Sequence, residues 1–108
     1  MADYIQVSTT TENKDDAKKI ARELVQKRLA ACVQTVGPIL STYWWEDKVN
    51  EEEEWLLIIK TGNKMYGEVE EVIKEMHPYE IPEIIASPVI KGSKDYLEWL
   101  EKVIILSD

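Results

Sequence analysis

The sequence predicts an α+β fold of the ferredoxin-like, split β-α-β type (βαββαβ), an antiparallel four-stranded sheet with two helices on one face and a short C-terminal helix. The first observation behind this prediction is the order in which β-favouring segments and segments of helical periodicity alternate along the chain. The second is the length of 108 residues, which suits a single domain over residues 1–108. The third is a hydrophobic content of 44%, which is enough for one core and too high for a disordered chain.

The first part of the chain predicts a strand, a helix and a long second strand. Residues 4–9 are rich in β-formers, and a polar connection follows up to Asn13. Asn13 is the predicted N-cap of a helix whose apolar residues recur at helical spacing until about Leu29. Residues 31–45 favour one long strand. Gly37–Pro38 predicts a bend or bulge within it.

An acidic run separates the second predicted strand from the third. The four glutamates at 51–54 predict a solvated hairpin tip, whose charges discourage pairing with other sheet edges. A cation-binding surface is the alternative for this run. Residues 55–61 predict a third strand with apolar side chains on both faces. A second helix follows, with Asn63 as its cap, and Pro78 stops it.

The last part of the chain predicts an edge strand and a short helix. Residues 84–90 favour the fourth strand, and Pro88 within it indicates an edge position or the end of regular pairing. Ser93 follows a turn and is the predicted N-cap of the C-terminal helix.

The predicted sheet has one face without helices, yet its strands do not alternate as a solvated face requires. The strand at residues 55–61 is apolar on both faces, and Trp44 and Trp45 point to opposite sides of the second strand. Leaving a few hundred Å² of this surface in water would forgo several kcal/mol, at ~25 cal/mol per Å². The sequence therefore predicts a tight homo-oligomer.

Charge and cysteine content exclude several classes of function. Lys and Arg total 13 and Asp and Glu total 21, so the net charge of −8 repels phosphate backbones. The single cysteine, Cys32, leaves no partner for an intramolecular disulfide. The N-terminal residues do not resemble a signal peptide, and no apolar run approaches the ~20 residues of a membrane helix. We expect a cytoplasmic protein that binds neither nucleic acid nor membrane.

Residues 77–83 (HPYEIPE) are the first place to look for a functional site. They contain the only histidine of the chain and two of its four prolines. Pro78 and Pro82 fix their own φ angles and favour extended geometry at the residues before them. The side chains of His77, Tyr79 and Glu80 are therefore predicted to lie on a stiff connector between the second helix and the last strand.

Five segments, taken in order, resemble one known family. They are residues 28–33 (RLAACV), 41–46 (STYWWE), 57–61 (LIIKT), 77–85 (HPYEIPEII) and 96–100 (YLEWL). Together these segments resemble the CutA divalent-cation-tolerance proteins over nearly the whole chain. The resemblance implies a ferredoxin-like subunit in a compact homotrimer, similar in architecture to the PII signalling proteins. It also implies association with copper and other divalent cations, without an established catalytic activity.

Cys32, His77 and Glu80 are the candidate metal ligands. A thiolate, an imidazole and a carboxylate suit Cu or Zn better than Mg or Ca, and in a trimer a neighbouring subunit could complete a site. Cys32 can instead be a small buried hydrophobe, and His77 can cap the last carbonyls of the second helix. Because Pro78 breaks the helix after His77, the spacing leaves open whether the three ligands converge. The resemblance, rather than the spacing, favours metal binding.

Four further side chains are candidates for a ligand site in an intersubunit cleft. They are Lys60, Tyr79, Trp45 and Glu83. Lys60 can pair with Glu80 or Glu83, bind an anionic ligand, or extend to solvent at the end of its strand. Tyr79 can add a hydroxyl group, and at least one of the two adjacent tryptophans is expected to anchor an interface.

The expected function is a divalent-cation-tolerance trimer that binds metal or signals without catalysis. The alternative is a small hydrolase-like enzyme with His77 as general acid or base, Glu80 orienting it and Cys32 as nucleophile. No nucleophile motif, glycine-rich phosphate loop or HExxH pattern supports that alternative. An RNA-binding sheet shares the fold order, but the net charge and the absence of Phe disfavour it.

Overall fold

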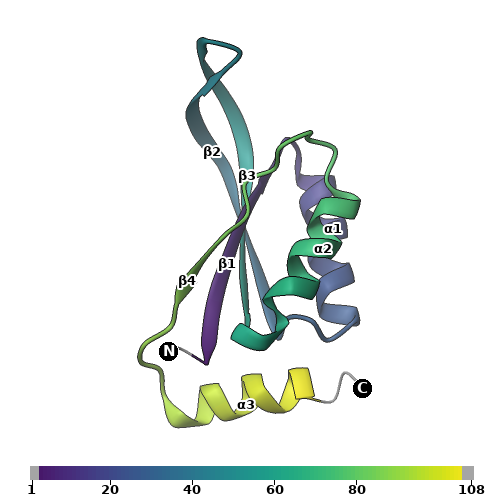
Figure 1. Cartoon of the computed structure of the whole chain (residues 1–108), viewed down its shortest axis with the longest axis vertical. Coiled ribbons are helices and arrows are strands. Elements are labelled where there is room, and N and C mark those ends of the chain that lie inside the picture. Colours follow the sequence, from purple (N-terminus) through teal and green to yellow (C-terminus); the bar gives the residue numbers. More distant parts are fainter. Residues whose placement is uncertain (1–2, 106–108) are drawn as a thin grey trace.

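The structure is a computed structural model that describes residues 3–105. The elements follow in the order β1 (Tyr4–Thr11), α1 (Lys14–Gln26), β2 (Cys32–Trp45), β3 (Lys48–Gly62), the 3₁₀ turn η1 (Asn63–Met65), α2 (Tyr66–Met76), β4 (Ile85–Pro88) and α3 (Lys94–Ile105). The strands pair antiparallel in the order β2-β3-β1-β4. Figure 1 shows α1 and α2 on one face of this sheet and α3 across its lower end. The predicted fold class is confirmed. The predicted single domain covers residues 1–108, and the prediction about a signal peptide concerns the N-terminus. Both include residues that lie outside the described part of the chain.

The core lies between the sheet and the two helices α1 and α2. Alternate side chains of β1 and β3 point to the helices, and Val7, Leu57 and Ile59 are fully buried there. The apolar stripes of α1 and α2 cover them, with Leu24 and Ile73 also fully buried. Burying a Leu or Ile side chain contributes roughly 1.5–3 kcal/mol each, so this layer holds the sheet and helices together.

Strand β1 is longer than predicted, and α1 is shorter. The polar connection predicted from Thr9 onward is wrong, because Thr9 and Thr11 are buried in β1 and Thr11 pairs with Trp55 of β3. Asn13 caps α1 as predicted, since its Oδ1 accepts the Asp16 N–H at 2.8 Å. The helix ends before Leu29 because Arg28 takes a left-handed φ of 57°.

The hairpin of β2 and β3 extends beyond the rest of the molecule (Figure 1). Its turn is formed by Glu46 and Asp47, whose φ angles of 51° and 61° suit a two-residue hairpin turn. The prediction that the glutamates at 51–54 form the tip is therefore wrong. They lie within β3 and pair with residues 39–42 of β2, because cross-strand pairing outweighs the weak strand propensity of glutamate.

The predicted bulge at Gly37–Pro38 is confirmed by a register shift between Val36 and Ile39. A Cβ atom at Gly37 would lie 2.5 Å from Cε3 of the Trp55 ring. The ring also carries Lys14 Nζ 5.5 Å from its centroid. Glycine at position 37 therefore lets the bulged strand approach Trp55 closely.

Gly37→Ala is expected to lower the free energy of unfolding by about 1–3 kcal/mol, because the added methyl displaces the Trp55 ring. The matched control is Gly67→Ala in α2, where an added Cβ meets nothing within 4 Å. Alanine favours the helix over glycine by up to about 1 kcal/mol, so the control is expected to stabilise the protein. Urea unfolding of both variants measures the difference, and equal effects of the two substitutions would contradict the packing of Trp55 on Gly37.

The second half of the chain differs from the prediction at three element ends. Asn63 begins η1, and α2 starts after this turn at Tyr66, so Asn63 is not the residue that caps α2. Strand β4 covers only four residues and ends at Pro88, at the edge of the sheet, as the proline predicts. Ser93 caps α3 as predicted, because its Oγ accepts the Tyr96 N–H at 3.2 Å.

The sheet face opposite α1 and α2, here called the open face, carries a mixed set of half-buried and exposed side chains. Their strand positions alternate with those of the core residues, and they are Gln6, Ser8, Cys32, Gln34, Val36, Leu56, Ile58, Lys60 and Ile85. Ile85 is 58% exposed and pairs with Ser8. Among the described residues, no helix is both long and apolar enough to cross a membrane.

Candidate functional site

The connector after α2 reaches the edge of β1 that β4 leaves unpaired. Strand β4 pairs only with residues 5–8 of β1, so the backbone of Thr10 lies beyond the last β4 partner. The Thr10 carbonyl oxygen lies 2.6 Å from Nε2 of His77, and both residues are buried. His77 therefore satisfies a backbone group that has no strand partner there.

The partners of His77 define its tautomer. A carbonyl oxygen can only accept a hydrogen bond, so Nε2 carries a proton and donates it to Thr10. The Tyr79 N–H donates to Nδ1 at 3.1 Å, so Nδ1 is unprotonated. The side chain does not bond the carbonyls of α2. The backbone N–H of His77 instead donates to the carbonyl oxygen of Ile73 at 2.8 Å. Both ring nitrogens are thus used within the chain.

Tyr79 extends this arrangement to β3. Its hydroxyl donates to Oε2 of Glu54 at 2.9 Å, and its ring lies 4.6 Å from the His77 ring, centroid to centroid. Glu54 is only 6% exposed. Burial, and then the hydrogen bond to Glu54, raise the pKa of Tyr79. Thr10, Glu54, His77 and Tyr79, called the His77 cluster below, connect β1, β3 and the end of α2.

The sequence predicted two of these four residues and missed Thr10 and Glu54. Thr10 was assigned to a polar connection and Glu54 to a solvated run. Their partners are 67 and 25 residues away in the chain, so no local pattern points to either contact. The one available signal is the position of Glu54 beside Trp55, where the acidic run meets the apolar strand.

A second tyrosine–glutamate pair lies on the projecting hairpin. The hydroxyl of Tyr43 in β2 hydrogen-bonds to the carboxylate of Glu52 in β3. This hydrogen bond, followed by burial, raises the pKa of Tyr43 to about 12. Because the shift favours the protonated phenol in the folded chain, its stabilisation is complete below about pH 10 and is lost as the pH rises through about 12.

Alkaline titration is therefore expected to show one tyrosine that ionises near pH 12, obtained as the difference between wild type and Tyr43→Phe. Glu52→Gln removes the acceptor charge and should move this midpoint toward the ordinary value of about 10. Glu51→Gln, one residue earlier in β3, is the control and should leave the midpoint unchanged. A Tyr43 midpoint near 10 in the wild type would contradict the Tyr43–Glu52 bond.

Cys32 lies away from the His77 cluster. It is the first residue of β2, it is half-buried, and it pairs with Lys60 of β3. Lys60 in turn pairs with Gln6, four residues before Thr10 on β1. At about 3.3 Å per residue, the level of Cys32 on the sheet is therefore about 13 Å from the level of Thr10, which His77 contacts. Burial, and then the electrostatic effect of Cys32, raise the pKa of the neighbouring Tyr96 in α3.

The remaining candidates are exposed. Glu80 and Glu83 lie on the surface of the connector, and Trp45 ends β2 beside the hairpin turn. Within residues 3–105, neither glutamate forms an ion pair with the half-buried Lys60. The described part of one chain also contains no group of three or more His, Cys, Asp or Glu side chains that could hold a metal ion. One chain thus brings Tyr79 to His77 but does not bring Cys32, His77 and Glu80 together.

The geometry also bears on the hydrolase alternative. A nucleophile and its general base need to lie within hydrogen-bond reach, about 2.6–3.2 Å apart. Cys32 and His77 do not meet this requirement within one chain, since they lie at different levels of the sheet. The arrangement fits a structural role for His77 better than proton transfer to a substrate.

A four-stranded antiparallel sheet with both core helices on one face places the chain among ferredoxin-like α+β proteins. Its sequence matches the family described as CutA1 divalent ion tolerance protein over residues 5–103. The divalent-cation tolerance protein CutA of Thermus thermophilus is 41% identical over 96 residues, which cover 89% of this chain and 93% of that protein. The chain belongs to the CutA1 divalent ion tolerance family.

Two further relatives extend the comparison. A structure of the periplasmic divalent cation tolerance protein CutA from Archaeoglobus fulgidus superposes with a TM-score of 0.91 at 36% identity, covering 94% of this chain and 98% of that chain. Protein CutA 1, chloroplastic, from Oryza sativa is 44% identical over 97 residues, which cover 90% of this chain and 55% of that protein. The chain thus spans about half the length of the rice relative. Because these names give two different locations, the cytoplasmic location of this chain stays a prediction.

Proposed function

We propose that the chain acts as a homotrimer that associates with copper and other divalent cations and serves in tolerance to these ions as a binding or signalling scaffold without catalysis. Membership of the divalent ion tolerance family supports the link to these cations. The observation that supports an oligomer most directly is the exposed apolar surface of the open face and the projecting hairpin.

Large aromatic and aliphatic side chains are exposed at two separate places on one chain. Trp44 is 73% exposed and pairs with the exposed Val49 across the hairpin, and Ile85 is exposed on the open face. A two-stranded hairpin without further packing is marginally stable in water. Exposed apolar side chains of this size are typical of interfaces between proteins. A neighbouring copy of the chain is therefore proposed to bury these side chains.

The sheet edges allow a head-to-tail assembly of copies. Strands β2 and β4 are the two edges of the sheet, and both carry unpaired backbone groups. Contact between the β2 edge of one copy and the β4 edge of the next joins two different surfaces. Such contacts form a ring where the rotation between copies closes, and the family resemblance favours a closed ring of three members. Lys60, Tyr79, Trp45 and Glu83 are the proposed lining of the cleft between neighbouring copies.

The proposed metal site is shared between copies, because the candidate ligands of one chain lie apart. Cys32, His77 and Glu80 supply the thiolate, imidazole and carboxylate that Cu or Zn accepts. His77 would have to release the Thr10 carbonyl or the Tyr79 N–H to offer a free nitrogen. The donors within the described part of one chain do not by themselves fit a metal ion.

Copper titration by calorimetry tests this assignment on variants that keep the oligomer mass of the wild type. Cys32→Ser, His77→Ala and Glu80→Gln are each expected to weaken copper binding at least tenfold, as expected for loss of one ligand. Glu68→Gln, an exposed carboxylate on α2, is the matched control and should bind copper as the wild type does. If His77→Ala binds copper as tightly as the wild type, His77 is not a ligand of the proposed site.

A further inference from the structure

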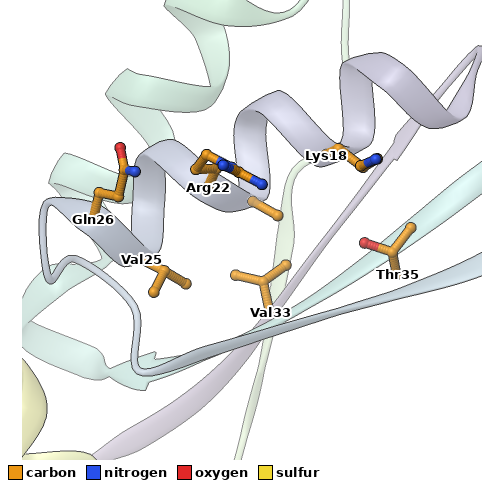
Figure 2. Close-up of a pocket in the computed structure, with 7 residues that line it drawn as sticks. Lys18, Arg22, Val25, Gln26, Val33 and Thr35 are labelled. Carbon is orange, nitrogen blue, oxygen red and sulfur yellow. The ribbon is translucent and has the colours of Figure 1, made fainter.

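A groove with a volume of about 280 Å³ lies between α1 and the edge strand β2. Its lining comes from both elements and consists of Lys18, Ala21, Arg22, Val25, Gln26, Val33 and Thr35. Figure 2 shows Val25 from the helix and Val33 from the strand on opposite walls, with Thr35 further along β2. The groove is on the helix side of the sheet, so it is separate from the open face and the candidate ligand Cys32.

The groove exists because small side chains meet at the edge of the sheet. Lys18, Ala21, Arg22 and Val25 follow the i, i+3, i+4, i+7 spacing and form one stripe of α1 beside the core stripe. Val33 is the facing residue of β2, and no further strand lies beyond β2 in the sheet. The result is an apolar floor of Ala, Val and Val side chains that this chain does not fill.

Two positively charged side chains, Lys18 and Arg22, border this apolar floor. Lys27, Lys64 and Lys74 form ion pairs, whereas neither Lys18 nor Arg22 has an ion pair or side-chain hydrogen bond within residues 3–105. Only three of the chain's 13 Lys and Arg side chains form ion pairs within residues 3–105, so it is their position beside the apolar floor that distinguishes Lys18 and Arg22. In Figure 2 both side chains lie along the groove, one helical turn apart.

We propose that this groove binds a small amphiphilic carboxylate, whose head lies at Lys18 and Arg22 and whose apolar body covers Val25 and Val33. A guanidinium group binds a carboxylate with two parallel hydrogen bonds, and the lysine adds a second positive charge. A groove of about 280 Å³ has room for a small ligand of about ten non-hydrogen atoms. This site is independent of the proposed metal site, so either can fail without the other.

Octanoate is the probe, followed by the methyl NMR signals of Val25 and Val33 in the full-length protein in its native oligomeric state. A ligand of this size in an open groove is expected to bind with a dissociation constant near the millimolar range. Octylamine has the same apolar body with the opposite charge, and acetate has the same head without the body. Neither should shift these signals at the same concentration and ionic strength.

Three variants separate the proposed contacts from general charge effects. Lys18→Ala/Arg22→Ala is expected to weaken octanoate binding at least tenfold. Lys19→Ala/Lys91→Ala removes the same charge from exposed positions outside the groove and should bind octanoate like the wild type. Thr35→Phe keeps both cations, suits an edge strand and fills the groove, so it should also abolish binding.

Any of three results would overturn the proposal. One is the absence of saturable octanoate shifts at Val25 and Val33, including the case in which a neighbouring copy covers the groove. A second is equal octanoate binding by Lys18→Ala/Arg22→Ala and Lys19→Ala/Lys91→Ala. Equal shifts from octanoate and octylamine would likewise show that the cations take no part.

Discussion

His77→Ala is expected to lower the free energy of unfolding by about 2–4 kcal/mol. The substitution removes a buried ring and leaves the Thr10 carbonyl and the Tyr79 N–H without their partners. Each unsatisfied buried group costs about 1–3 kcal/mol, partly relieved by water that enters the space. Urea unfolding at one fixed protein concentration measures the loss, because the stability of an oligomer depends on concentration.

The control for this experiment is Glu75→Ala, an exposed substitution two residues earlier in α2, which should change stability by less than about 0.5 kcal/mol. Tyr79→Phe tests the other half of the His77 cluster, since it removes only the hydroxyl that donates to Glu54. A double-mutant cycle between His77→Ala and Tyr79→Ala should show coupling, because the two rings touch. A His77→Ala variant as stable as the control would contradict the role assigned to the cluster.

Ile85→Glu is expected to have the second large effect, on assembly rather than on the fold of one chain. Ile85 is 58% exposed in the single chain, so a charge there costs little until another copy covers it. An uncompensated charge buried in an interface costs about 3–5 kcal/mol. The subunit dissociation constant should therefore rise about a thousandfold.

Size-exclusion chromatography with light scattering measures this change in mass. Val25→Glu is the matched control, since Val25 is also an exposed β-branched apolar residue but lies on α1, away from the open face. It should leave the mass of the oligomer unchanged. If Ile85→Glu also keeps the mass of the wild type, the open face around β4 is not the interface.

The fold was predictable because each element carries a local signal. The β-α-β-β-α-β order, the Asn13 and Ser93 caps, the bulge at Gly37–Pro38 and the edge position of Pro88 all follow from side-chain chemistry that acts over a few residues. The ends of the strands were not predictable in this way. Residues 51–54 became part of β3 through their cross-strand partners, and such long-range pairing outweighs local propensity.

The candidate site was predictable only in part. The two prolines and the single histidine pointed to residues 77–83, and His77 and Tyr79 are indeed joined by a hydrogen bond. Their partners Thr10 and Glu54 come from distant strands and carry no distinctive local pattern. Within one chain Cys32 does not meet the connector, and their proposed convergence between copies would depend on contacts that no local spacing encodes.

Sedimentation equilibrium of the wild-type protein at micromolar concentration tests the central claim, that copies of this chain cover the open face and the hairpin. The proposed function predicts a single species with three times the mass of one 12.5 kDa chain. This mass should persist on dilution, because apolar surface buried between copies resists dissociation. A species with the mass of one chain at micromolar concentration would contradict the claim.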